Sequence, residues 1–286
     1  MTQAPILVGT DLSNSSEQAI QQAGAWARRT GAPLVVCHIA PDEVFRALET
    51  PKVAAALRAR TESLLGPSAP ALEVVIGSGS PHAALVHLAD ERGATLLVVG
   101  ASSRESFDRV LFGSTAEQVV RYAHCPVLVA RKSPADGIVL AATDFSDPAT
   151  TAVAAAAEEA NRRAVPLRLV HSLYEPSTSL SLLGPMVISL PEIPAAERDE
   201  LKSAAEATLR SLLAATHASG ACEVVLGAPA SAIPAEAKSL GAGLVVVASR
   251  GRTGLARIAL GSVAEAIARN APCSVLAVRK SAGQPK

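Results

Sequence analysis

Short apolar runs alternate with longer amphipathic stretches along this chain, and the alternation predicts strands and helices in turn. Continuous apolar runs, such as "PILVG" at residues 5–9 and "TLLVV" at 95–99, are typical of strands buried on both faces. The stretches between them have the spacing of helices. Strands that are apolar throughout and alternate with helices indicate an α/β fold, in which helices cover both faces of a parallel sheet.

The predicted elements occur twice in the same order. In the first part of the chain we expect strands at 5–9, 34–39, 72–76, 95–99 and 127–130, and helices at 15–29, 51–65, 81–92 and 114–123. In the second part we expect strands at 138–142, 167–171, 222–226, 244–248 and 275–278, and helices at 148–163, 195–215, 229–240 and 262–270. Asp147 and Pro148 fit a helix N-cap and a first-turn proline.

The residues themselves repeat as well. "PILVGTDLS" (5–13) matches "IVLAATDFS" (138–146), and "GSTAEQVVRYAHCPVLVARK" (113–132) matches "GSVAEAIARNAPCSVLAVRK" (261–280). A repeat of this length is a domain. We therefore expect one domain over 1–132 and a second over 137–286, with a polar linker between them and an insertion at about 172–200 in the second copy.

Composition narrows the classes of function. The chain has 286 residues, 49% of them hydrophobic, so two packed cores are expected. A net charge of 0 and an aromatic content of 2% disfavour nucleic acid and anionic membranes as partners. No signal peptide or membrane span is apparent, which favours a cytoplasmic protein. The cysteines have no metal-ligand spacing, and we expect them to be reduced and mostly buried: Cys37, Cys125, Cys222 and Cys273.

Two segments meet at the carboxyl ends of the predicted strands, where ligands of such sheets bind. Asp11 or Asp144 follows the first strand, and "GASSRESFDRVLFGS" (100–114) or "ASRGRTGLARIALGS" (248–262) follows the fourth. The terminal Gly-Ser opens a helix, whose free amides favour phosphate. The carboxylate of Asp11 or Asp144 would repel phosphate, and it suits a ribose hydroxyl or a hydrogen-bond donor of a base better. A structural alternative stays open, because Ser-x-x-Glu at 114–117 and 262–265 also fits a capping box.

Taken together, "TDLS", "TDFS", the stretch after the fourth strand and the "CPVLVAR" ending resemble the universal stress protein family, in a tandem form that spans essentially the whole chain. The resemblance implies two Rossmann-like (adenine-nucleotide alpha-hydrolase-like) domains, each a five-stranded parallel sheet with helices on both faces. It also implies binding of ATP or AMP, with Mg²⁺ accompanying ATP. Family members dimerise through the last strand, so we expect the two domains to pair within one chain, with a homodimer as a further expectation.

The family's nucleotide-binding motif, G-x2-G-x9-G-[ST], is incomplete in both copies. The second copy keeps most of the implied site, namely Asp144, Gly251, Arg252, Gly261 and Ser262, but has Ala248 at the first glycine. The first copy has a degenerate set, Asp11, Gly100, Gly113 and Ser114, with Ser103 at the second glycine and Glu105 near the phosphates. We therefore expect the second copy to bind nucleotide and the first to bind weakly or not at all.

Other chemistries find little support in the sequence. GxxxxGK[ST], GxSxG and HExxH motifs are absent, and His38 and His171 are expected to bond local backbone. We expect a stress-response regulatory protein that binds adenine nucleotide without dedicated catalysis, beyond slow incidental ATP hydrolysis. The alternative is a nucleotide-free scaffold that binds protein or small apolar partners through its surface or residues 172–200. That apolar segment is expected to cover a neighbouring site or the domain groove, or else to form a partner contact.

Overall fold

The computed structural model describes residues 3–47, 49–101, 113–174, 179–181, 187–189, 194–250 and 260–279. The elements of the first half are the strands β1 (Ile6–Thr10), β2 (Leu34–Ala40), β3 (Leu72–Ser78), β4 (Leu96–Gly100) and β5 (Val127–Ala130), and the helices α1 (Asn14–Thr30), α2 (Asp42–Ala47), α3 (Thr50–Leu65), the 3-10 turn η1 (Gly66–Ser68), α4 (Pro81–Glu91) and α5 (Ser114–Tyr122). The elements that the pattern predicts are all present, whereas the short α2 was not expected.

The second half repeats this order. Its strands are β6 (Val139–Ala142), β7 (Leu167–Leu173), β10 (Gly220–Leu226), β11 (Leu244–Ala248) and β12 (Ser274–Val278), and its helices are α6 (Asp147–Arg163), α7 (Ala195–Ala215), α8 (Pro229–Ser239) and α9 (Ser262–Asn270). One expected cap is wrong. The N-cap of α6 is Ser146, whose hydroxyl oxygen accepts from the Ala149 amide, so Asp147 lies inside the first turn.

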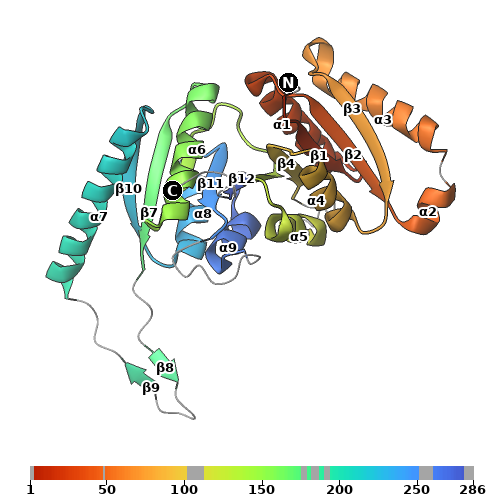
Figure 1. Ribbon diagram of the computed structural model, residues 1–286. Coiled ribbons are helices and arrows are strands. Elements are labelled where there is room, and N and C mark those ends of the chain that lie inside the picture. The colour runs from red at the N-terminus through yellow and green to blue at the C-terminus, as the bar shows by residue number, and fades with distance from the viewer. Residues whose placement is uncertain are drawn as a thin grey trace.

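The ten strands form one sheet in the order β10-β7-β6-β11-β12-β5-β4-β1-β2-β3 (Figure 1). Within each half the neighbouring strands run parallel, as expected for an α/β fold. The halves join where β5 and β12 pair antiparallel, with Leu128 opposite Leu276. These equivalent strands are fully buried and would otherwise be exposed edges, which invite pairing.

Helices cover both faces of the sheet, and each face has its own core. On one face, buried residues of α1, α3, α6 and α7 form a continuous cluster with the strands. On the other face, residues of α4, α5, α8 and α9 form a second cluster. Both clusters extend across the junction of the halves, so the ten strands share two continuous apolar layers. Of the helices described, none is both long and apolar enough to cross a membrane.

Two arginines tie each half to the other on the α5–α9 face. Arg131, which follows β5, is buried and donates to the carbonyl oxygens of Ala268 at 2.5 Å and Arg269 at 3.4 Å, near the end of α9. Its repeat equivalent Arg279, which follows β12, donates to the carbonyl oxygens at the end of α5. Burial lowers the pKa of Arg131 to about 10, so the guanidinium stays charged at neutral pH. Positive charge at a helix C-terminus is favourable.

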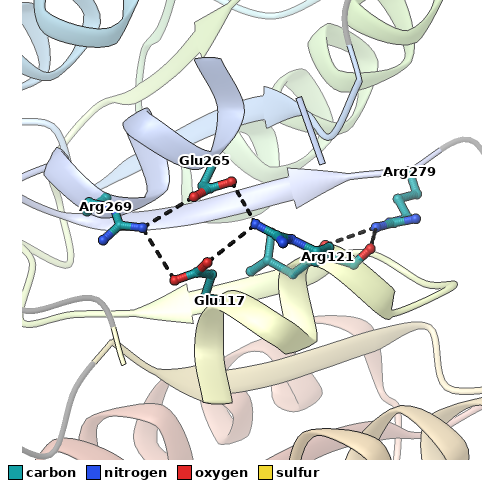
Figure 2. Close-up of polar contacts among 6 residues, drawn as sticks. Glu117, Arg121, Glu265, Arg269 and Arg279 are labelled. Carbon is teal, nitrogen blue, oxygen red and sulfur yellow. Dashed lines mark hydrogen bonds and ion pairs between the residues drawn. The ribbon is translucent and has the colours of Figure 1, made fainter. Parts of the chain in front are cut away.

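A four-membered ion-pair ring lies beside Arg279 (Figure 2). Arg121 of α5 contacts Glu117 at 3.3 Å and Glu265 of α9 at 3.1 Å. Arg269 contacts the same two carboxylates at 3.3 and 3.2 Å. This ring replaces the capping boxes considered from the sequence, because the N-caps are Gly113 and Gly261 and both glutamates pair with arginines instead.

We expect Glu117→Gln combined with Glu265→Gln to lower the free energy of unfolding by about 1 kcal/mol, since the four side chains are a quarter to a half exposed. Urea denaturation in low salt measures the loss, which should shrink at about 1 M salt because surface charges are screened. Glu206→Gln is the control, since Glu206 pairs only loosely with Arg210 at 3.9 Å. An equal loss in low and high salt would contradict this account of the ring.

On the opposite face, α1 and α6 meet around a buried carboxylate. The Glu159 side chain is 0% exposed, and one of its oxygens lies 2.6 Å from Nη2 of Arg29 and 2.6 Å from Nε of Arg163. The guanidinium groups of these arginines lie 5.6 and 5.8 Å from the ring centroid of Trp26, a cation–π distance. Trp26 therefore packs at the contact between the halves.

The insertion contains the antiparallel strands β8 (Ser179–Ser181) and β9 (Val187–Ser189). Figure 1 shows this pair projecting away from the large sheet and its helices. Neither strand of this pair lies over the groove between the halves. Residues 175–178, 182–186 and 190–193 of the segment fall outside the described residues, so the expected cover over a site or the groove and the alternative partner contact both stay predictions.

The cysteines are free thiols in unequal environments. Cys37 and Cys273 are buried, whereas Cys125 and Cys222 are half-buried. Burial raises the pKa of the Cys37 thiol to about 12 and that of Cys125 and Cys273 to about 11. Because the thiolate is the reactive form, we expect a thiol reagent at about pH 8 to modify Cys222 first in the native protein. Mass spectrometry of tryptic peptides checks this order, and early labelling of Cys37 would contradict it.

Candidate functional site

Each half has a cavity at the carboxyl ends of its strands, between the first strand, the fourth strand and the helix that follows it. In the second half the cavity is about 370 Å³ and is lined by residues of β6, β7, β11, α6, α8 and α9 and the adjoining loops. In the first half the equivalent cavity is about 130 Å³. Parallel sheets bind ligands at this edge, and small-molecule sites usually exceed about 300 Å³. Of these two strand-end cavities, the second therefore has ordinary ligand size and the first does not.

The loop after the first strand positions the aspartate in both halves. The Asp144 Oδ1 accepts from the Ser146 amide at 3.1 Å and from its hydroxyl at 2.5 Å, and Asp11 makes the same two bonds with Ser13. The residue after each aspartate, Phe145 or Leu12, has a positive φ of 64° or 66°. Non-glycine residues seldom adopt this conformation, and it is held in both copies at the rim of a cavity.

Hydrogen bonds also lower the pKa of Asp11, the aspartate of the first half. Burial alone would raise the pKa of Asp11, but hydrogen bonds from Ser13 and Ser16 outweigh this effect and hold the pKa below its usual value.

Histidines of the second strand contact the same loop in both halves. Nδ1 of His38 lies 2.9 Å from the Thr10 carbonyl oxygen, and Nδ1 of His171 lies 2.8 Å from that of Thr143. The predicted local backbone contacts of both histidines are therefore confirmed.

The fourth strand and the following helix bring backbone amides to the cavity. The Gly261 amide donates to the Ser249 carbonyl oxygen at 2.8 Å, which brings the chain back to the strand end just before α9 begins. Gly113 makes the equivalent bond to Ala101 at 2.7 Å. The first amides of α9 have no partner within the helix and carry its positive dipole end, an arrangement that attracts anions.

The structure brings part of the predicted site together. Asp144, Gly261 and Ser262 all line the second cavity, beside Arg250. Asp11 and Gly100 line the first cavity, but the described lining of α5 consists of Thr115 and Ala116, not Gly113 or Ser114. Gly251, Arg252, Ser103 and Glu105 fall outside the described residues.

Much of the remaining cavity lining was not predicted. Ile233 and Pro229 of α8, Val247 of β11 and Ser172 of β7 contribute to the second cavity. Their helix and strand periodicity marks them as core or surface positions and not as ligand contacts, so only the folded cavity shows them. Among the described residues, no group of three His, Cys, Asp or Glu side chains could hold a metal ion.

Comparisons with known proteins agree with this architecture. The model of the universal stress protein family matches residues 4–131 and 137–279. The universal stress protein Rv2623 of Mycobacterium tuberculosis is 30% identical over 300 residues, which cover 96% of each chain. A universal stress protein of Archaeoglobus fulgidus has a similar fold, with a TM-score of 0.73 and 20% identity over 98% of this chain and 99% of its own. A shorter one from that organism, solved in complex with dAMP, is 27% identical over 44% of this chain and 97% of its own, with a TM-score of 0.37. The chain belongs to the universal stress protein family.

Proposed function

We propose that this protein is a stress-response regulator that binds an adenine nucleotide, ATP or AMP, in the cavity of its second half. The observation that carries the proposal is the convergence of Asp144 with Gly261 and Ser262 on one cavity of about 370 Å³. This combination offers a carboxylate, a helix N-terminus and an apolar wall in one enclosure. Each of these suits one part of a nucleoside phosphate.

Each part of the cavity suits one part of a nucleotide. The apolar side chains of Ile233 and Val247 would pack against a base. The Asp144 carboxylate would accept hydrogen bonds from ribose hydroxyls. The amides at the start of α9 would donate to phosphate. Gly251 and Arg252 join the site on the evidence of the sequence motif, and Mg²⁺ would arrive with the phosphates of ATP.

The remaining assignments follow from the same comparison of the halves. We propose that residues 1–132 and 137–286 are domains that act as an intramolecular pair through β5 and β12, in a cytoplasmic protein. The first domain would bind nucleotide weakly or not at all, because its cavity is about 130 Å³. Because no dedicated catalysis is proposed, regulation would depend on whether nucleotide is bound. Partner proteins would bind the nucleotide-bound and nucleotide-free forms with different affinities.

The test is whether adenine nucleotide accompanies the full-length protein. Heat denaturation releases bound nucleotide, which chromatography identifies, and equilibrium titration with AMP or ATP gives the affinity and stoichiometry. We expect one nucleotide per chain. If purified protein carries no nucleotide and neither AMP nor ATP binds at millimolar concentration, the proposal fails and a nucleotide-free scaffold takes its place.

A further inference from the structure

A third cavity lies between α1 and α6, beside the junction of β5 and β12. Its volume is about 380 Å³, and its wall includes Trp26 of α1, Ala155 and Arg162 of α6, and Leu276 of β12. None of the described residues that line it lines either strand-end cavity. The volume falls within the range of small-molecule sites, so this cavity is large enough for a ligand of its own.

The repeat places a counterpart of this cavity at the other end of the β5–β12 junction, and there the linker between the halves occupies the space. The Ser274 hydroxyl donates to Oε1 of Gln22 at 2.9 Å, and the Ser274 amide donates to the Ser133 hydroxyl oxygen at 2.9 Å. A Cβ on Gly243 would lie 2.5 Å from the Pro134 carbonyl oxygen, so the linker packs closely against the chain before β11. The polar contacts of Gln22 and Ser274 hold the linker in this position.

At the cavity, the residues equivalent to this polar pair are apolar. Ala155 occupies the repeat position of Gln22, and Pro126 occupies that of Ser274. Both residues line the cavity. Neither side chain can form a hydrogen bond, and proline also lacks the amide hydrogen that Ser274 donates to the linker. The two exchanges therefore remove the contacts that hold the linker and leave an apolar wall in their place.

The polar groups of the wall are largely engaged with neighbouring backbone. The Thr30 hydroxyl donates to the Trp26 carbonyl oxygen at 3.0 Å, and the Gln3 side-chain amide donates to the Thr30 carbonyl oxygen at 2.9 Å. The Thr95 hydroxyl donates to the Pro5 carbonyl oxygen at 3.4 Å. A ligand in the cavity would therefore meet chiefly apolar surface, which favours a molecule with an apolar body.

Positive charge exceeds negative charge beside this apolar wall. Arg162 contacts Glu158 at 2.8 Å, and the two side chains are 38% and 64% exposed. Arg29 and Arg163 share the buried Glu159, so three arginines here face two carboxylates. Burial lowers the pKa of Arg29, and the Glu159 charge opposes this shift, whereas the charges of the other two arginines add to it. An anion beside Arg162 would compensate the excess, and the planar guanidinium suits a carboxylate or sulfonate group.

We propose that the cavity between α1 and α6 is a second ligand site, which binds a small organic anion. The apolar body of the ligand lies along Trp26 and Leu276, and its carboxylate or sulfonate group contacts Arg162. The site is distinct from the strand-end cavities, and its existence does not depend on nucleotide binding there. Residues 280–286, the repeat counterpart of the linker, are a less suitable occupant because Pro126 and Ala155 lack the contacts that would hold them.

Anilinonaphthalene sulfonate is the probe, because it combines an apolar body with one anionic group and fluoresces when bound. Trp26 is the single tryptophan of the chain, so energy transfer from it to the probe reports binding near the cavity. The titration uses the full-length protein with and without millimolar AMP. Ala155→Leu fills the cavity, and Ala154→Leu is its matched control, since Ala154 is exposed on the same helix. Thermal unfolding verifies that each variant is folded.

We expect Ala155→Leu to weaken probe binding at least about tenfold and Ala154→Leu to change it less than about twofold. AMP should leave the affinity for the probe unchanged. Arg162→Gln should weaken binding of the sulfonate at least about fivefold and leave binding of the uncharged N-phenylnaphthylamine within about twofold, because the variant removes the charge and leaves the apolar wall in place.

The proposal is overturned if a folded Ala155→Leu variant binds the probe within about twofold of the wild type, or if AMP displaces the probe. Equal losses for the charged and uncharged probes in Arg162→Gln would overturn the role of Arg162. Deletion of residues 280–286 removes Lys280 and Lys286, whose loss by itself would weaken binding of an anion. If this deletion instead tightens probe binding at least about tenfold, the chain's own residues 280–286 occupy the cavity and the proposal is wrong.

Discussion

Replacing Glu159 by alanine should lower the free energy of unfolding by about 3–5 kcal/mol, because it removes a fully buried carboxylate from between two arginines. Arg29 and Arg163 would remain at the α1–α6 contact beside Trp26 without their counter-charge. Burial already lowers the pKa of Arg29, and the Glu159 charge offsets only part of that. The variant would therefore leave positive charge in a poorly solvated place. Urea denaturation followed by circular dichroism measures the loss.

The neighbouring residue provides a matched control. Glu158 lies on the same helix and contacts Arg162 at 2.8 Å, but its side chain is 64% exposed. Glu158→Ala should change the free energy of unfolding by less than about 1 kcal/mol. Equal losses in the two variants would mean that burial between the halves is not what makes Glu159 important.

Asp144→Ala should weaken AMP binding at least about tenfold, which corresponds to about 1.4 kcal/mol. The variant removes the carboxylate that lines the larger cavity, where it would meet the ribose. It also removes the acceptor for Ser146, so part of the loss would come from a looser loop. Isothermal titration of the full-length protein gives the affinity.

Asp11→Ala separates these two contributions. Asp11 holds Ser13 with the same two hydrogen bonds, so its removal loosens an equivalent loop in the half with the smaller cavity. Its effect on AMP affinity should be much the smaller of the two. The opposite order, with Asp11→Ala costing more affinity than Asp144→Ala, would place the nucleotide in the first half.

Much of the fold could be predicted because local pattern and tertiary packing agree. Apolar runs became β1, β4 and their repeats, and the helix predicted at 195–215 is α7 with the same bounds. The cap of α6 was misplaced by one residue because Asp147 and Ser146 are both good N-cap residues. The folded loop decides between them, since Ser146 is already held by Asp144.

The candidate site was harder to predict from the sequence than the fold, because it depends on which side chains come together after folding. The aspartates and the Gly-Ser pairs stand out as strand-end and helix-start residues. In contrast, Ser172 and Ile233 look like ordinary strand and helix positions, and only the folded chain places them at the wall of one cavity. The pairing of Glu117 with Arg269 joins residues from different halves, and no local spacing indicates it.

The contact between α1 and α6 shows what the presence of two repeats in one chain permits. In a homodimer every interface substitution appears twice, so a glutamate at this contact would enter together with its symmetry copy and place two like charges nearby. Here Trp26 and Glu159 occupy equivalent positions of the repeat, one in each half. Covalent linkage lets each side change alone, and the contact has become one between unlike surfaces. We therefore expect the first half to pair with the second half of its own chain in preference to another copy of itself.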